Sequence, residues 1–554
     1  MILYYCRKSP FSIRTPYKIA QNFFLKGPRS NINMFRIGAV DTHTHELEAR
    51  NPSSYFVYSR YRRLHEFFSS SDLYDLERRY PLMVMMDITR CFPSIYSHSI
   101  TWAVVSTKFA KDNTSSMGFA NRFDRFMQSM NYNETNGICV GPELSRIFAE
   151  IILTKIDVVL ESSATGKNLR RGLDYEIRRY VDDYFLFVRD TKVARSLSRL
   201  LAEALGSVGL SLNEQKLQTL GRPFLTPTSR AISLVGTVFS KFSDRILEKR
   251  QPGDARTSVY VPRYIRDAGR LRNSFLLELK TACSEVGSGY EVVANYLVAA
   301  LTLRIEWATD WIEEGIEEGI DPKRYVDLIL LLSDLAFFLY TVKPSVSSSY
   351  SLSRLILRIE VLVESNLSEY RGYIVDYLSN LVIILHNSDS LKNLIEYDAK
   401  IPIESLNILV AFSSITKRDI FYRSTIQSYV AENSNFEYFQ TVSILYCIGS
   451  DIRFDDLRYN LVDHLLNRAV IDLDPETSAH DAHLLLDMLS CPYVNLSDRQ
   501  ELLDKIRTRL SLPKLSAAEL GASVKEMEEN PWFVQWSGPG LFNLLQKKEL
   551  NSVY

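Results

Sequence analysis

The stretch "RRYVDDYFLFV", residues 178–188, places two adjacent aspartates between two runs of aromatic and branched apolar side chains. Such runs favour β-strands, and a two-residue connection between them indicates a hairpin. Aspartate tolerates turn geometry, although glycine would suit it better. The sequence therefore predicts a hairpin with Asp182 and Asp183 at its turn. Because neighbouring like charges repel, the rest of the chain must explain why they are there.

Two other segments contain side chains that belong with this hairpin. "PLMVMMDI" (81–88) reads as an apolar strand that ends near Asp87. "NGICVGPELSRIFAEIIL" (136–153) has a glycine turn at Gly141, followed by apolar residues at helical spacing. If the strand pairs beside the hairpin, its aspartate converges with Asp182.

Converging carboxylates repel strongly in a partly dry site and normally need a cation. Oxygen ligands suit Mg²⁺, which is typically held by one or two carboxylates together with substrate phosphates. Two such ions about 4 Å apart can clamp the attacking and leaving oxygens of an in-line phosphoryl transfer. We therefore expect two Mg²⁺ ions, for which Mn²⁺ can substitute.

In order and spacing, these segments resemble the palm motifs of reverse transcriptases. Asp87 matches the first metal-binding aspartate, and "YVDD" matches the third motif. "ICVGPELSRIFAEI" resembles the segment before the second palm helix. "GLSLNEQKLQTL" is similar to the next motif, with Lys216 at its basic position, and "LVGTVF" (234–239) resembles the strand that leads to the primer grip. The resemblance covers roughly residues 50–240.

The resemblance implies which residues perform each role. Asp87, Asp182 and Asp183 would be the catalytic, metal-binding residues. Phe92, five residues after the first of them, matches the steric gate that excludes a 2′-hydroxyl and selects dNTPs. The residues expected to bind the dNTP are Phe92, Gly141 and Lys216.

A basic stretch follows the motifs, at residues 241–272. We expect Arg263, Arg266 and Arg270 to share one helix face and to contact the phosphates of a nucleic acid. Upstream, "AISLVGTVF" (231–239) is strand-like in its composition.

The chain also departs from retroviral and intron-encoded enzymes. Val140 stands where those usually have glutamine, and striped helices stand where a thumb and nuclease would be. This combination resembles the abortive-infection and defence-associated reverse transcriptases of bacteria, whose C-terminal regions are HEAT-like. That resemblance implies phage defence in the bacterial cytoplasm and a homo-oligomer, a trimer or a hexamer. It also implies DNA that is made from dNTPs and often primed by the protein, with or without a template RNA. A tyrosine hydroxyl could serve as the primer, and Tyr4, Tyr5, Tyr17 and Tyr554, near the chain ends, are the candidates.

The fold class expected is α+β: fingers and palm of a right-hand polymerase, followed by an all-α, HEAT-like helical repeat region. The expected divisions are a fingers-like region (1–80), a palm (81–240), a basic connector in the thumb position (241–290) and the helical repeat domain (291–554). The run "LILLLSDLAFFLYTV" is short and contains Asp334, so we expect a buried helix and no membrane span. The six scattered cysteines include no C-x-x-C pair, so neither a disulfide framework nor a zinc knuckle is indicated.

Two alternatives stay open. The helical array could be the working part of an interaction protein whose palm is vestigial, but the intact Asp87, Phe92, Asp182 and Asp183 disfavour this. An RNA-dependent RNA polymerase is also disfavoured, because those enzymes usually carry Gly-Asp-Asp and a second aspartate where Phe92 stands.

Overall fold

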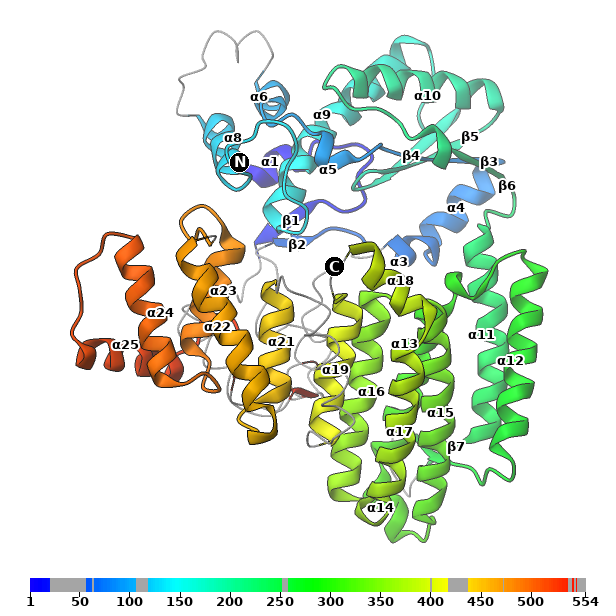
Figure 1. The fold of residues 1–554 in the computed structure, drawn as a ribbon. Coiled ribbons are helices and arrows are strands. Elements are labelled where there is room, and N and C mark those ends of the chain that lie inside the picture. The colour runs from blue at the N-terminus through cyan, green and yellow to red at the C-terminus, as the bar shows by residue number, and fades with distance from the viewer. Residues whose placement is uncertain are drawn as a thin grey trace. The chain divides into compact units, whose positions relative to one another are not determined.

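The computed structural model describes residues 1–19, 56–61, 64–105, 118–251, 258–398, 401–416, 437–471, 473–536, 541–542 and 545. Within these residues the chain forms two compact units, which divide between Thr226 and Pro227 (Figure 1). The first unit contains a β-sheet with helices, and the second is almost entirely helical. The expected mixed α+β class with a helical C-terminal region is therefore confirmed.

The first unit is built on a four-stranded antiparallel sheet with the strand order β4-β5-β3-β6. Its strands are β3 (Leu82–Asp87), β4 (Tyr175–Tyr180), β5 (Asp183–Val188) and β6 (Gln218–Gly221). Only Val181 and Asp182 connect β4 to β5, so the predicted hairpin is confirmed. The predicted strand that ends at Asp87 is confirmed as well, and it pairs directly beside the hairpin.

Both faces of this sheet are covered. Alternate residues of each strand point to opposite sides, so the strands contribute to two different cores. Val84 and Tyr184 belong to one core, which also includes apolar residues of helices α9 (Glu143–Gly166) and α10 (Thr191–Gly206). Met83 and Phe185 belong to a second core, which includes residues of α3 (Leu64–Phe68) and α4 (Ser71–Arg79). Burial on both faces explains why the two central strands, β3 and β5, are apolar almost throughout.

The N-terminal segment is part of the same unit. The backbone amide of Ile13 donates to the carbonyl of Arg179, and the Arg179 amide donates to Phe11, both at 2.9 Å, so this segment extends the sheet at the edge of β4. Beyond it, β1 (Pro16–Ile19) pairs with β2 (Phe56–Tyr58). The remaining helices of the unit are α1 (Ile2–Cys6), α5 (Cys91–Ser94), α6 (Ser99–Val104) and α8 (Phe119–Ser129).

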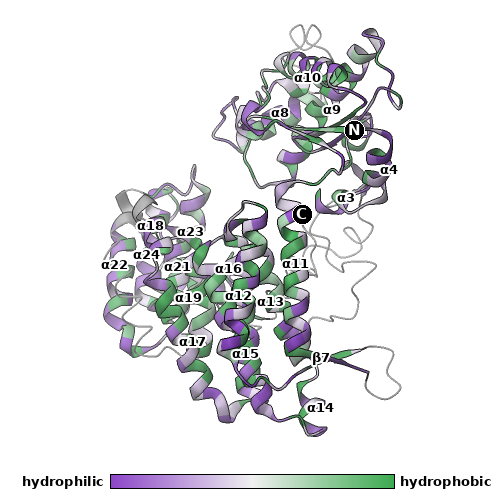
Figure 2. Cartoon of the chain, turned by 90° about the vertical axis from the view of Figure 1, so that its right-hand side faces the viewer, coloured by the Kyte–Doolittle hydropathy of each residue, from purple (hydrophilic) through white to green (hydrophobic). Residues whose placement is uncertain are grey.

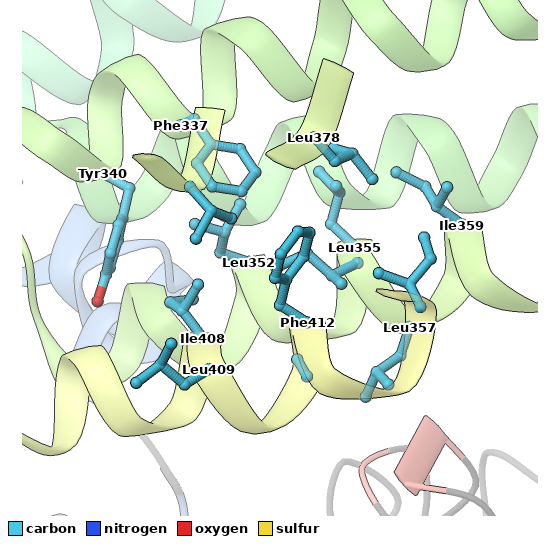
Figure 3. Packing of buried hydrophobic residues seen from close by; sticks show 14 of the residues in the cluster. Phe337, Tyr340, Leu352, Leu355, Leu357, Ile359, Leu378, Ile408, Leu409 and Phe412 are labelled. Carbon is cyan, nitrogen blue, oxygen red and sulfur yellow. The ribbon is translucent and has the colours of Figure 1, made fainter. Parts of the chain in front are cut away.

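The second unit buries one continuous apolar core between helices. Figure 2 shows apolar and polar bands on the same helices, as expected where one stripe of each helix is buried. In Figure 3, Phe337, Leu355 and Phe412 come from three different helices and lie in one cluster of buried side chains. The longer helices are α11 (Pro227–Ile246), α12 (Ala268–Glu285), α13 (Ala294–Thr309), α15 (Pro322–Val342), α16 (Val346–Ser365), α17 (Arg371–His386) and α19 (Ile403–Thr416). They continue as α21 (Tyr438–Ile448), α22 (Asp455–Ile471), α23 (Ala479–Ser490), α24 (Leu496–Arg509) and α25 (Ala517–Glu529), with shorter α14 (Ile312–Glu317) and α18 (Asp389–Asp398).

The predicted strand at residues 231–239 is wrong, and so is the strand inferred from "LVGTVF". These residues lie inside α11. Its buried residues Ala231, Val235, Phe239, Phe242, Ser243 and Ile246 recur every three or four positions, the helical period. The β-branched composition of a short window was therefore overridden by the longer apolar pattern. A short hairpin, β7 (Leu247–Arg250) with β8 (Val259–Pro262), follows the helix.

The expectation of a buried helix at "LILLLSDLAFFLYTV" is confirmed. These residues lie in α15, which by length and composition alone could cross a membrane. However, 72% of its most apolar window is buried inside the protein, as is usual for the central helix of a helical unit.

Candidate active site

Three aspartates meet at one end of the sheet of the first unit. Asp87, the last residue of β3, lies directly opposite Asp183, the first residue of β5. Opposite residues of an antiparallel pair project to the same face, with Cβ atoms about 5 Å apart. Asp182 precedes Asp183 in the turn. The strand register therefore explains why residues almost a hundred positions apart in sequence come together.

The carboxylates influence one another. Burial, together with the negative charges of Asp182 and Asp87, raises the pKa of Asp183 from 3.8 to about 6. Burial also raises the pKa of Asp182, and the charge of Asp87 adds to this effect. Burial, and then the negative charges of Asp182 and Asp87, raise the pKa of the nearby Cys91 thiol to about 12. Such a cluster holds negative charge that calls for a positive partner.

Lys216 supplies one positive charge at this cluster. Its Nζ lies 2.7 Å from Oδ2 of Asp87, while its side chain remains 67% exposed. Two backbone hydrogen bonds hold the segment before Lys216 beside the end of β3: Asn213 N donates to the carbonyl of Asp87 (2.8 Å), and Thr89 N donates to the carbonyl of Ser211 (2.9 Å). The hydrogen bond to Asp87 raises the pKa of Lys216. The lysine is thus held in place by one exposed ion pair, which a competing cation can replace.

Phe92 lies in the short helix α5, half-buried against the core of the first unit. The loop before α9 packs on this helix, because Ile138 N donates to the carbonyl of Phe92 at 3.0 Å. Gly137 allows that approach: a Cβ there would lie 3.0 Å from the Pro93 carbonyl oxygen, at a φ of +86°. Gly141 has a φ of +120°, with open space around it, so its backbone conformation is what requires glycine.

The residues present fit a divalent metal ion. Within the described residues, no group of three or more histidine, cysteine, aspartate or glutamate side chains is arranged to enclose a metal by itself. Mg²⁺ does not require one, because it is usually bound by one or two carboxylates, with substrate phosphates and water as the other ligands. Asp87 and Asp182 provide such a set. Its oxygen-only chemistry and mutual repulsion suit a hard cation.

A buried ionic cluster, which was not predicted from the sequence, lies behind the hairpin. Arg179, fully buried in β4, forms ion pairs with Glu150 (2.8 Å) and Asp157 (2.7 Å) of α9. The sequence did carry a signal: an arginine inside a predicted strand, and two acidic residues seven positions apart on the apolar face of a helix. Long-range pairing is needed to connect the two.

The three arginines predicted to bind phosphate are placed differently from what we expected. Arg263 and Arg266 precede α12, which begins at Ala268, so the prediction of one shared helix face is wrong. Arg266 and Arg270 do line a common hollow of about 280 Å³. It is also lined by Arg245, which was not predicted, and by Tyr264, Ile265, Asp267, Leu271 and Ser274. Arg263 instead donates from Nε to the carbonyl of Leu247 at 3.0 Å.

The tyrosines considered as primers differ in accessibility. Tyr4 and Tyr17 are 62% and 54% exposed. Tyr5 stacks on Phe119, with 6.1 Å between the ring centroids. Tyr554 lies outside the described residues.

Comparison with known proteins identifies the segment that contains the aspartates. Residues 40–238 match the family model of reverse transcriptase (RNA-dependent DNA polymerase), which indicates a nucleotidyltransferase polymerase. No curated protein matches the sequence. Among solved structures, telomerase from Candida albicans in complex with the TWJ fragment of telomeric RNA is similar at 12% identity and a TM-score of 0.21. The match covers 60% of this chain and 53% of that one, so the chain spans about half the length of the telomerase chain.

Proposed function

Because residues 40–238 match the reverse transcriptases, we propose that the chain is a DNA polymerase that uses Asp87, Asp182 and Asp183 to bind two Mg²⁺ ions, with Mn²⁺ as a substitute. The observation that carries this proposal is the convergence of these carboxylates at one end of the sheet, where burial and mutual repulsion raise the pKa of Asp182 and Asp183. Polymerases of this family generally use divalent metal ions.

The reaction joins a hydroxyl oxygen to the α-phosphorus of a dNTP. The bond from that phosphorus to the oxygen bridging to the β-phosphate breaks, pyrophosphate leaves, and the hydroxyl proton passes to water. Divalent ions held by Asp87 and Asp182 would acidify the attacking hydroxyl and neutralise charge on the phosphates. Asp87 and Asp182 hold negative charge where those ions are needed. Lys216, once displaced from Asp87, is free to pair with the triphosphate.

Other residues would select the nucleotide and contact the nucleic acid. Phe92, on the helix that follows β3, would fill the space that a 2′-hydroxyl needs, and Gly141 lets the backbone approach the nucleotide. Three guanidinium groups around one hollow, from Arg245, Arg266 and Arg270, suit the phosphates of a nucleic acid, and the 71% exposed Tyr264 beside them offers a ring on which a base can stack.

The resemblance to bacterial defence-associated enzymes supports finer proposals. The enzyme would act in phage defence in the bacterial cytoplasm, as a homo-oligomer, and would start DNA on a tyrosine hydroxyl, with or without a template RNA. The exposed Tyr4 and Tyr17 support such priming, because a priming hydroxyl must be able to reach the nucleotide.

The purified full chain should be incubated with Mg²⁺ and labelled dNTPs or NTPs, with and without an RNA template, and with EDTA as the control. We expect label from dNTPs only, dependence on the metal, and label that stays with protein through SDS and phenol until protease is added. Incorporation of NTPs alone would instead support an RNA polymerase. Label that partitions as free nucleic acid before protease would contradict tyrosine priming. No incorporation under any condition would contradict the proposed activity.

A further inference from the structure

The turn that carries Asp182 has an unfavourable backbone. Val181, the first of its two residues, has a φ of +55°. Positive φ at this place in a two-residue hairpin favours glycine, and a β-branched residue there is strained. Strain of this kind persists only where the surrounding structure enforces it. Something next to the turn must therefore hold it.

Arg179 is in a position to do this. Its side chain is fully buried on the strand that leads into the turn, and Nη1 donates to the carbonyl of Val181 at 2.9 Å. The other donors are occupied by carboxylates: Nε and Nη2 bind Asp157, while Nη1 and Nη2 bind Glu150, at 2.7–3.1 Å. All five N–H groups of the guanidinium thus have acceptors. The two carboxylates fix the plane of the guanidinium, so that its remaining N–H points at the turn.

The carboxylates are themselves held from several directions. Asp157 accepts hydrogen bonds from Tyr184 Oη (2.8 Å) and from Ser9 Oγ. Ser9 belongs to the N-terminal segment, outside the residues that match the reverse-transcriptase family. In the same segment, Arg14 Nη1 donates to the hydroxyl of Tyr180 at 2.6 Å, directly before the turn. The N-terminal segment, α9 and both hairpin strands therefore meet around one guanidinium.

We propose that Arg179 is a positioning residue: clamped by Glu150 and Asp157, it fixes the Val181 carbonyl and so holds the turn that carries Asp182 at the end of the sheet where Asp87 lies. The metal-binding part of this inference rests on the proposed function. The fixing of the turn does not, because it follows from the hydrogen bonds alone. Lysine cannot replace the guanidinium, since its three donors lack the planar geometry that spans two carboxylates and a carbonyl.

Arg179→Lys tests the proposal, and Arg178→Lys is its matched control. Arg178 is the neighbouring residue on the same strand and is also buried, at 8% exposure. Its hydrogen bonds run to Asp72, to Glu176 and to the carbonyl of Ile177, away from the turn. Both variants lose buried ion-pair geometry, and only one loses the contact with Val181.

Two quantities are measured on the full chain: the rate of hydrogen–deuterium exchange in the peptide that contains the turn, and the Mn²⁺ concentration that half-saturates the protein, determined by calorimetry. For Arg179→Lys we expect about tenfold faster exchange at the turn and about tenfold weaker Mn²⁺ binding, the scale of a lost hydrogen bond to a charged group. Arg178→Lys should change either value less than about twofold, as expected for a site without a contact to the turn. Equal effects of the two variants would overturn the proposal.

A rescue experiment separates positioning from general stability. Val181→Gly removes the strain, because glycine adopts positive φ readily. In the Arg179→Lys background it should restore most of the Mn²⁺ affinity, whereas it cannot replace a lost core ion pair. No recovery would show that Arg179 is only structural. If Arg179→Lys does not fold, Glu150→Gln serves instead, with a smaller effect of the same sign expected and an unchanged turn contradicting the proposal.

The two proposals can fail separately. If the wild-type protein binds no Mn²⁺ and incorporates no nucleotide, the proposed function is wrong. The exchange rates at the turn still decide whether Arg179 holds it.

Discussion

Asp183 should destabilise the metal-free protein at neutral pH. Its pKa in the folded protein is about 6, above its ordinary value of 3.8, because the ionised carboxylate is partly buried beside Asp182 and Asp87. A raised pKa means that folding favours the protonated form. This contribution to stability is fully present below about pH 4 and is lost as the pH rises through about 6. Asp183→Asn removes the charge and retains the shape of the side chain.

The size of the effect follows from the pKa. A rise of about two pKa units corresponds to at most about 3 kcal/mol, and solvent screening at this partly exposed side chain reduces that to about 1–2 kcal/mol. For a unit of roughly 200 residues this shifts the melting temperature by roughly 2–6 °C. In EDTA at pH 8, Asp183→Asn should therefore melt higher than the wild-type protein by that amount. At pH 4 the two should coincide.

Thermal unfolding from pH 4 to pH 8 in EDTA, followed by circular dichroism, measures this difference. Added Mn²⁺ should reverse it at pH 8, because the cation stabilises the protein with three carboxylates more than the variant with two. Asp75→Asn is the control, since that carboxylate is 59% exposed and should have little effect at either pH. If the wild-type protein melts at or above Asp183→Asn at pH 8 in EDTA, the carboxylates do not repel one another as argued.

Three further predictions concern the nucleotide, the nucleic acid and the assembly. Phe92→Ala should raise the ratio of rNTP to dNTP incorporation, since its ring is proposed to exclude the 2′-hydroxyl; an unchanged ratio in an active variant would make it a core residue only. Replacing both Arg266 and Arg270 by alanine should weaken DNA binding. It should also reduce the slope of log affinity against log salt by the amount expected for the loss of about two phosphate contacts. A slope equal to that of the wild-type protein would place the nucleic acid elsewhere. Light scattering at micromolar concentration should give a trimer or a hexamer, and a monomer would contradict self-association.

Much of the first unit could be predicted from the sequence because its signals are local. The apolar run that ends at Asp87, the two-residue connection at Val181 and Asp182, and the apolar periodicity of α9 each fit within a short window. The family motifs then brought these pieces together in one site. Phe92 and Lys216 were identified from their spacing along the sequence relative to neighbouring motifs, and that spacing can be read from a single sequence.

The rest depends on contacts or patterns that short windows do not contain. The prediction of a strand at residues 231–239 was wrong because the β-branched residues there belong to a helix. The helical spacing of its buried residues is visible only over the whole length of α11. The arginines after it were assigned to a helix that begins later, at Ala268. The Arg179 cluster joins Ser9, Asp157 and β4 across more than a hundred residues, and no local pattern specifies such pairing.

The central claim is that converging aspartates bind the metal ions for nucleotide addition, and Asp182→Asn tests it most directly. The substitution removes charge and leaves packing unchanged, so circular dichroism should show the wild-type fold. With Mg²⁺ and labelled dNTPs, we predict that the wild-type protein incorporates label and that Asp182→Asn incorporates none above the EDTA background. Full incorporation by a folded Asp182→Asn protein would contradict the account.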